Sequence, residues 1–237
     1  CLDMNQGGAM IDLRPYAAKL YRPCGIGTAN VQDVSYPFLI QANYRAGFFT
    51  HYAGEGTVKS CRVSYNGRTA DMCLCRTKAE FSEENGVRTL TLEPVEMELK
   101  DLKVTIQSIF RFKEGSGAVE TERRVLKTSI PGAKVEIDEY TTACYGYTEY
   151  PEDMTVITLA TDKENLKYEY KDRSIEGSAF ASAVIPPINT KVSVCAENAS
   201  SYAREGYAFS PMFSLGVKKE IGEGECFKSW LKLEKEN

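Results

Sequence analysis

An Asn-Gly pair at Asn66-Gly67 constrains this chain more than any other short feature. Both residue types tolerate the positive φ angles of a type I′ turn, so the pair predicts a two-residue hairpin loop that fixes the register of both strands. Val63 then faces Ala70 on an apolar face, and Arg62 lies opposite Asp71 on the other face. Because opposite charges at facing positions stabilise a sheet, the register chosen from the turn alone also accounts for the charged residues.

The same pattern recurs at Asn85-Gly86. A two-residue turn there places Phe81 opposite Leu90, which forms an apolar pair. It also places Glu83 opposite Arg88, a second pair of opposite charges. Two independent turn signals therefore predict two hairpins whose registers agree with the side chains on both faces.

The segment that joins the two hairpins changes its inward parity. The inward positions before it, Ala70 and Met72, are even-numbered, whereas the inward Phe81 after it is odd-numbered. A strand with a two-residue period cannot make this change without an extra residue. We therefore expect one strand over residues 68–83, with a bulge or kink within residues 75–78.

Further turn signals divide the rest of the chain into short alternating segments. They lie at Lys100-Asp101, at Glu114 to Gly117, at Pro131-Gly132 and at Gly222 to Gly224. No sustained helical period occurs, and residues 200–205 are the one place where a short turn of helix is expected. This spacing predicts an all-β fold: a large antiparallel β-sandwich with few or no helices, formed by residues 1–237 as a single domain.

Bulk properties exclude several classes of function. The formal net charge is −4, so the chain lacks the basic surface that nucleic-acid binding needs. No apolar run approaches the ~18 residues that span a bilayer, and we expect no signal peptide, because the sequence opens at Cys1 without a charged and then an apolar segment. A cytoplasmic location is slightly favoured, while a lipoprotein anchored at Cys1 and a secreted protein stay open as alternatives.

The eight cysteines and the single histidine limit the chemistry. The cysteine spacing is too loose for a small disulfide scaffold, so mostly buried thiols are expected. His51 is the only histidine, which excludes a zinc site built from several imidazoles. Cys73-Leu74-Cys75 has no second pair at zinc-finger spacing and is interpreted as ordinary strand, with a metal or redox role as the alternative. We therefore predict no metal and no other cofactor.

Residues 43–55 gather chemically active side chains into one short stretch. They include the cation of Arg45, the imidazole of His51, and the aromatic rings of Phe49 and Tyr52. Aromatic faces stack on the C–H groups of sugars, and charged side chains hydrogen-bond to sugar hydroxyl groups. An imidazole can also act as a general acid or base. Arg45 and Tyr52 are thus candidates for substrate binding and His51 for catalysis; the alternative is an amphipathic strand with a hydrogen-bonded histidine.

Residues 139–153 form a second stretch, with four tyrosines and several carboxylates interrupted by Gly146 and Pro151. Tyrosine offers broad contact area at little cost in rotamer entropy. Carboxylates beside it can bind hydroxyl groups, hold Ca²⁺ or form an acid–base pair. We take Glu149 as a catalytic candidate. The substrate-binding candidates here are Tyr140, Tyr145, Tyr147 and Glu152. The alternative is a tyrosine-rich strand that runs into a solvated acidic loop.

The end of the chain carries a resemblance to a known fold. Residues 206–216, Gly-Tyr-Ala-Phe-Ser-Pro-Met-Phe-Ser-Leu-Gly, followed by Gly222-Glu223-Gly224-Glu225, resemble the terminal strands of galactose-mutarotase-like β-supersandwich domains. The resemblance implies a fold associated with epimerases, polysaccharide lyases and accessory domains of glycosidases. Mutarotases commonly pair two histidines with a glutamate. The single His51 departs from that pattern, and no catalytic residue carries over by motif.

Three functions compete on these observations. The first is a carbohydrate-recognising or carbohydrate-processing β-sandwich, which requires residues 43–55 and 139–153 to converge on one concave face. The second is a non-catalytic structural or assembly subunit, in a homo- or hetero-oligomer, whose aromatic clusters form a protein interface. The third is a sugar-directed enzyme that uses His51, a tyrosine or a carboxylate as base. We prefer the first, with a carbohydrate as ligand and with neither nucleic acid nor a membrane as partner.

Overall fold

The structure is a computed structural model. It describes residues 9–11, 38–40, 56–72, 79–113, 116, 118–144, 157–169, 171–185, 190–207 and 211–235. Strands and turns make up nearly all of these ranges, and no α-helix occurs within them. Consequently no helix in the described ranges is long and apolar enough to cross a membrane. The all-β prediction is confirmed.

Eight strands of the described chain form one sheet, here called sheet A. In spatial order they are β1 (Ala9–Ile11), β2 (Phe38–Ile40), β3 (Gly56–Tyr65), β10 (Lys134–Cys144), β17 (Pro211–Gly222), β16 (Ser200–Tyr207) and β13 (Ser174–Gly177), with β4 (Arg68–Asp71) paired to β3. Neighbouring strands run antiparallel, except that β1 and β2 run parallel.

Ten further strands of the described chain form sheet B. In spatial order they are β12 (Asn165–Lys167), β11 (Thr158–Thr161), β14 (Phe180–Ile185), β15 (Thr190–Ala196), β18 (Cys226–Lys235), β9 (Ala118–Thr128), β8 (Leu102–Lys113), β6 (Val87–Leu92) and β5 (Ala79–Glu84), with β7 (Val95–Leu99) paired to β8. All of these pairs are antiparallel.

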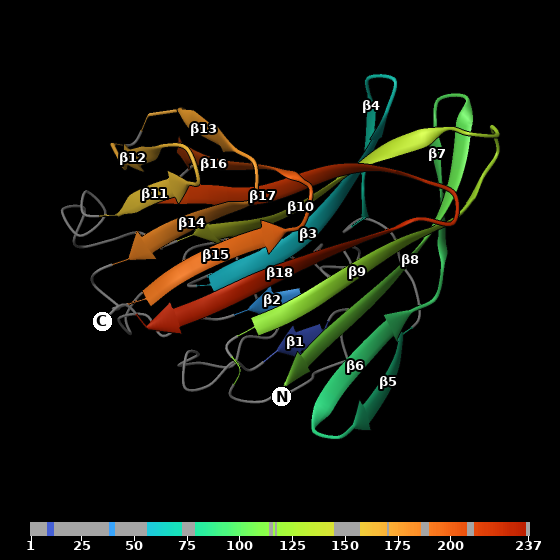
Figure 1. Cartoon of the computed structure of the whole chain (residues 1–237), viewed down its shortest axis with the longest axis horizontal. Coiled ribbons are helices and arrows are strands. Elements are labelled where there is room, and N and C mark those ends of the chain that lie inside the picture. The colour runs from blue at the N-terminus through green and yellow to red at the C-terminus, as the bar shows by residue number, and fades with distance from the viewer. Residues whose placement is uncertain are drawn as a thin grey trace, which may run out of the picture.

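The two sheets pack face to face, so the prediction of a large antiparallel β-sandwich is confirmed. Figure 1 shows β15, β18, β9 and β8 of sheet B in front, with β3, β2 and β1 of sheet A visible behind and between them. Alternate side chains from both sheets meet in one apolar core, among them Val63 and Leu215 from sheet A and Phe110 and Phe227 from sheet B. The opposite faces of both sheets carry the remaining, mostly polar positions. That residues 1–237 form a single domain stays a prediction.

Both Asn-Gly hairpins have the predicted registers. Asn66 and Asn85 have φ angles of 46° and 52°, which the type I′ turn requires. Arg62 pairs with Asp71 across the first hairpin. In the second hairpin, Phe81 pairs with Leu90 and Glu83 with Arg88; Arg88 Nε also donates a 3.0 Å hydrogen bond to Glu83 Oε2.

The predicted single strand over residues 68–83 is wrong. β4 ends at Asp71 in sheet A, and β5 begins at Ala79 in sheet B, so the chain crosses from one sheet to the other. The change in inward parity is thereby explained, because each sheet sets its own inward face. The expected bulge within residues 75–78 lies outside the described residues, as does Cys73-Leu74-Cys75.

The expected turn of helix over residues 200–205 is also wrong. These residues belong to β16, where Ser201, Ala203 and Glu205 are buried at alternate positions. The period of two was masked because two of these three inward residues are polar. Glu205 is tolerated in the interior because Arg173 Nε and the backbone N–H of Glu169 both donate to its carboxylate.

Three cysteines have described side chains. Cys61 is buried, Cys195 is half-buried and Cys226 is exposed. Cys61 agrees with the expectation of mostly buried thiols and Cys226 is an exception; for the eight cysteines together it stays a prediction.

Candidate functional site

Only one of the predicted site residues is described by the structure. Tyr140 lies on β10, half-buried, with its side chain on the outer face of sheet A. The others lie outside the described residues: Arg45, His51, Tyr52, Tyr145, Tyr147, Glu149 and Glu152. The part of the site that can be built from described residues therefore starts from Tyr140.

The two predicted clusters are joined to neighbouring strands at the same end of sheet A. β3 begins at Gly56 and β10 ends at Cys144, and these two residues are register partners in an antiparallel pair. Residues 43–55 lead into the first residue of β3, and residues 145–153 follow the last residue of β10. These two strand ends lie side by side. Tyr140 lies on this same strand pair, opposite Ser60.

Alternation along β10 sends neighbouring carboxylates to opposite faces. Ile137 and Glu139 face the core, so Asp138 and Tyr140 face outward. Across the outer face, Asp138 has Arg62 of β3 on one side and Lys218 of β17 on the other. We call the outward group of Arg62, Asp138, Tyr140, Tyr202 and Lys218 the Asp138 cluster. It is built from four adjacent strands: β3, β10, β17 and β16.

Direct contacts tie the Asp138 cluster together. Tyr202 Oη donates to the Asp138 carboxylate, at 3.1 Å from Oδ1 and 3.3 Å from Oδ2. The Lys218 ammonium lies 5.1 Å from the centre of the Tyr202 ring. On the other side, the Arg62 guanidinium lies 4.3 Å from the centre of the Tyr140 ring. Each cation is thus within cation–π range of one tyrosine, with the carboxylate between the two pairs.

Burial gives Asp138 an unusual proton affinity. The residue is 5% exposed, and loss of solvation raises the pKa of its carboxyl group to about 6. The positive charge of Lys218, the Tyr202 hydrogen bond and the positive charge of Arg62 act in the opposite direction, whereas Glu136 adds to the rise. Burial and the neighbouring Asp138 charge also raise the pKa of Tyr202, so its phenol stays protonated and donates.

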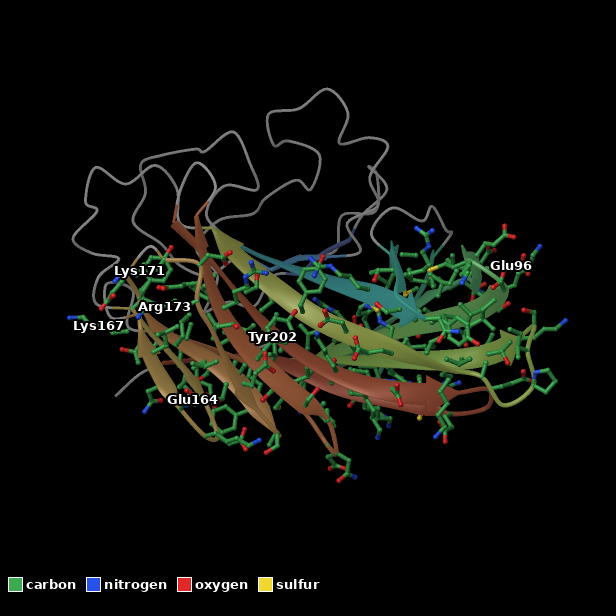
Figure 2. All side chains as sticks on the ribbon, turned by 90° about the horizontal axis from the view of Figure 1, so that it is seen from above. Glu96, Glu164, Lys167, Lys171, Arg173 and Tyr202 are labelled. Atoms are coloured by element: carbon green, nitrogen blue, oxygen red, sulfur yellow. The ribbon has the colours of Figure 1, made fainter. Side chains whose placement is uncertain are left out.

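This arrangement has the groups to bind a polar ligand and to transfer a proton. A carboxyl group that titrates near pH 6 can accept a hydrogen bond in one state and donate one in the other. The tyrosine rings provide flat apolar surface, and the cations provide donors. Among the described residues, no group of three or more His, Cys, Asp or Glu side chains is placed to hold a metal ion. Figure 2 shows Tyr202 midway along the molecule, between Glu96 at one end and Lys171 and Arg173 at the other.

Glu139, the first residue of the second predicted cluster, has a structural role instead. It is 1% exposed and forms an ion pair with Arg123 of β9, which is equally buried. Arg123 also donates to Ser108 Oγ and lies 4.8 Å from the centre of the Phe110 ring. The pair joins sheet A to sheet B through the core and does not reach the outer face.

Sequence reasoning named only Tyr140 among the five members of the Asp138 cluster. Asp138, Tyr202 and Lys218 lie on strands far apart in the sequence, and Arg62 was noted only as the hairpin partner of Asp71. A local signal existed, since Asp138 alternates with the apolar Val135 and Ile137 and shares its face with Tyr140. The pairing of β10 with β17 could not be read from any turn, because the two strands are not joined by a short loop.

Comparison with known proteins identifies the fold. No family model and no curated protein matches this chain. A putative aldose 1-epimerase from Klebsiella pneumoniae matches with a TM-score of 0.52 and 10% identity, over 75% of this chain and 62% of that one. A quadruple mutant of an alpha-N-acetylgalactosaminidase from Bifidobacterium bifidum matches with a TM-score of 0.54 and 10% identity, over 74% of this chain and 30% of that one.

A galactose mutarotase related enzyme from Lactobacillus acidophilus also matches, with a TM-score of 0.48 and 8% identity, over 77% of this chain and 83% of that one. The fold of this chain is galactose-mutarotase-like, as the resemblance of its C-terminal strands implied. The match spans 62% of the epimerase and 30% of the galactosaminidase, so it corresponds to only part of either protein.

Proposed function

We propose that this chain recognises or processes a carbohydrate on the outer face of sheet A. The observation that carries the proposal is the Asp138 cluster, in which a buried carboxyl group lies between two cations and beside two tyrosines. Aromatic faces, charged donors and a carboxyl acceptor are the groups that bind sugar rings and their hydroxyl groups. Solved structures of the same fold include proteins described as an aldose epimerase and a galactosaminidase, which supports this ligand class.

The proposal includes the two predicted clusters. The paired ends of β3 and β10 support it, because residues 43–55 and 145–153 connect to neighbouring positions. In this proposal Arg45, Tyr52, Tyr145, Tyr147 and Glu152 contact the sugar together with Tyr140, and His51 and Glu149 are the catalytic candidates.

A glycan-binding screen with matched arginine variants tests the proposal. Arg62→Ala removes a cation from the Asp138 cluster, whereas Arg68→Ala removes an exposed cation from the tip of the same β3–β4 hairpin. For a sugar that the wild type binds, we expect Arg62→Ala to weaken binding about 10-fold and Arg68→Ala to leave it unchanged; the loss is that of one charge-assisted contact.

Tyr147→Ala tests the second cluster in the same screen, and we expect a comparable loss of affinity because a stacking surface is removed. A wild type that binds no glycan in the screen would overturn the proposed function. Binding that is equal in the wild type, Arg62→Ala and Tyr147→Ala would remove the outer face of sheet A from it. Self-association or capture of a partner that depends on Tyr147 would instead favour the alternative role as an assembly subunit.

A further inference from the structure

Gly216 of β17 lies between the two tyrosines of the Asp138 cluster. It is the register partner of Tyr140 on β10 and of Tyr202 on β16, so the three residues form one row across the outer face. A Cβ atom at Gly216 would lie 2.3 Å from both Cε1 and Cζ of the Tyr202 ring and 2.5 Å from its hydroxyl oxygen. The Tyr202 ring therefore occupies the space that any other residue type at position 216 would fill.

This placement has a consequence for Asp138. The ring lies over the backbone of β17, and from there its hydroxyl group reaches the Asp138 carboxylate one strand further on. The restriction is steric: Gly216 does not have a positive φ angle, so an alanine could adopt its backbone conformation. What an alanine could not do is leave room for the ring.

We infer that Gly216 is a positioning residue of the proposed sugar site, which lets Tyr202 lie across β17 and hold the carboxyl group of Asp138. The geometry stands by itself, whereas the use of Asp138 in sugar recognition rests on the proposed function. Gly216 thus acts on Asp138 through Tyr202, whose ring lies over Gly216 and whose hydroxyl donates to the Asp138 carboxylate.

The inference predicts a change in the titration of Asp138. The charged and titratable groups that face its carboxyl are Arg62 from β3, Lys218 from β17, Tyr202 from β16, and Glu136 from its own strand. A phenol that donates to the carboxylate stabilises the charged form, so it lowers the pKa of Asp138. Displacing the phenol must therefore raise the pH at which Asp138 titrates.

The test is a carbon-13 NMR titration of side-chain carboxyl groups, with the Asp138 signal assigned from Asp138→Asn. We expect Gly216→Ala to move the midpoint of Asp138 up by about one pH unit, and Tyr202→Phe to move it in the same direction by a similar amount. Gly222→Ala is the matched control. It lies on the same strand and the same face, and its added Cβ meets nothing nearer than 3.4 Å. Its midpoint should equal that of the wild type.

A second background shows whether Gly216 acts through Tyr202. In a Tyr202→Ala chain the space over Gly216 is empty, so adding Gly216→Ala should change neither the stability nor the midpoint of Asp138. If Gly216→Ala alone prevents folding, the Tyr202→Ala background should restore it. An unchanged midpoint in Gly216→Ala, or a Gly216→Ala effect that persists without Tyr202, would overturn the inference.

Sugar binding separates this inference from the proposed function. With a sugar found in the glycan screen, Gly216→Ala should bind several-fold more weakly than Gly222→Ala. Equal binding by these two variants would show that positioning of Tyr202 does not serve recognition. A wild type that binds no sugar would overturn the proposed function, while the NMR titration would still decide whether Gly216 positions Tyr202.

Discussion

Two neighbouring carboxylates of β10 have opposite surroundings. Asp138 faces outward and Glu139 faces the core, yet both are almost fully buried, with 5% and 1% exposed. Glu139 forms a direct ion pair with Arg123 of the other sheet. Asp138 accepts a hydrogen bond from the Tyr202 phenol. Among the described residues it forms no direct ion pair with Arg62 or with Lys218.

The partners of the two carboxylates account for the difference between them. The Glu139 carboxylate is in direct contact with the Arg123 guanidinium, and this buried pair joins the two sheets. A buried carboxylate whose nearest donor is neutral gains proton affinity, and the pKa of Asp138 rises to about 6. Burial alone therefore does not separate the two carboxylates; their partners do.

The largest effect is expected from breaking the buried ion pair of Arg123 and Glu139, here called the inner pair. Arg123→Met takes the guanidinium away from the buried Glu139 carboxylate, and we expect a loss of about 3–5 kcal/mol in the free energy of unfolding. Urea unfolding measures it. Lys127→Met is the control on the same strand, since its side chain is exposed and its loss should cost less than about 1 kcal/mol. A loss from Arg123→Met no larger than that of the control would contradict the structural role of the inner pair.

A slightly smaller effect, with a defined pH dependence, is expected from Asp138→Asn. The pKa of Asp138 is raised from 3.8 to about 6 in the folded chain, so folding favours the protonated form. The wild type is therefore stabilised at low pH and loses stability as the pH rises from about 4 to about 6. Asparagine does not titrate, so its advantage over the wild type should be small near pH 4 and reach roughly 3 kcal/mol above pH 7.

Urea unfolding of both proteins at a series of pH values measures this difference. A gap between Asp138→Asn and the wild type that is constant from pH 4 to pH 7 would mean that Asp138 keeps an ordinary pKa. A gap that shrinks as the pH rises would reverse the assignment, because Asp138 would then behave like an ion-paired carboxylate.

The smallest effect on the free energy of unfolding is expected at an exposed carboxylate, which serves as a comparison for the buried Glu139 and Asp138. Glu223, in the turn between β17 and β18, accepts hydrogen bonds from the backbone N–H of Thr128 at 2.8 Å and from its hydroxyl at 3.2 Å. Glu223→Ala should lower the free energy of unfolding by about 1 kcal/mol, whereas Glu220→Ala, on the exposed face of β17, should change it by less than about 0.5 kcal/mol. Equal values for the two would show that this contact contributes nothing.

Local structure could be predicted from the sequence wherever a turn fixed it. Asn66-Gly67 and Asn85-Gly86 gave the correct partners for Arg62 and Phe81, because a type I′ turn determines the register on both sides. The prediction failed where the chain changed sheets between Asp71 and Ala79, since a parity change has the same signature as a bulge. It failed again over residues 200–205, where the inward side chains of a strand include Ser201 and Glu205.

The candidate site could be predicted only in part. Tyr140 was identified from the density of tyrosines around it, which is a local signal. The groups that surround the Asp138 carboxyl include Tyr202 and Lys218, which lie more than sixty positions away along the chain; Asp138 and Tyr202 are separated by 64 residues. Such pairings depend on which strands are neighbours in the sheet, and no short turn specifies that order.

Chemical-shift mapping of a bound sugar on nitrogen-15-labelled protein tests the central claim most directly. We expect the perturbed amides to cluster on β3, β10, β17 and β16 around Arg62, Asp138, Tyr140 and Gly216, with the core pair of Arg123 and Glu139 affected only as neighbours. Perturbations confined to the outer face of sheet B, or to the β5–β6 hairpin, would contradict the assignment of the outer face of sheet A as the site.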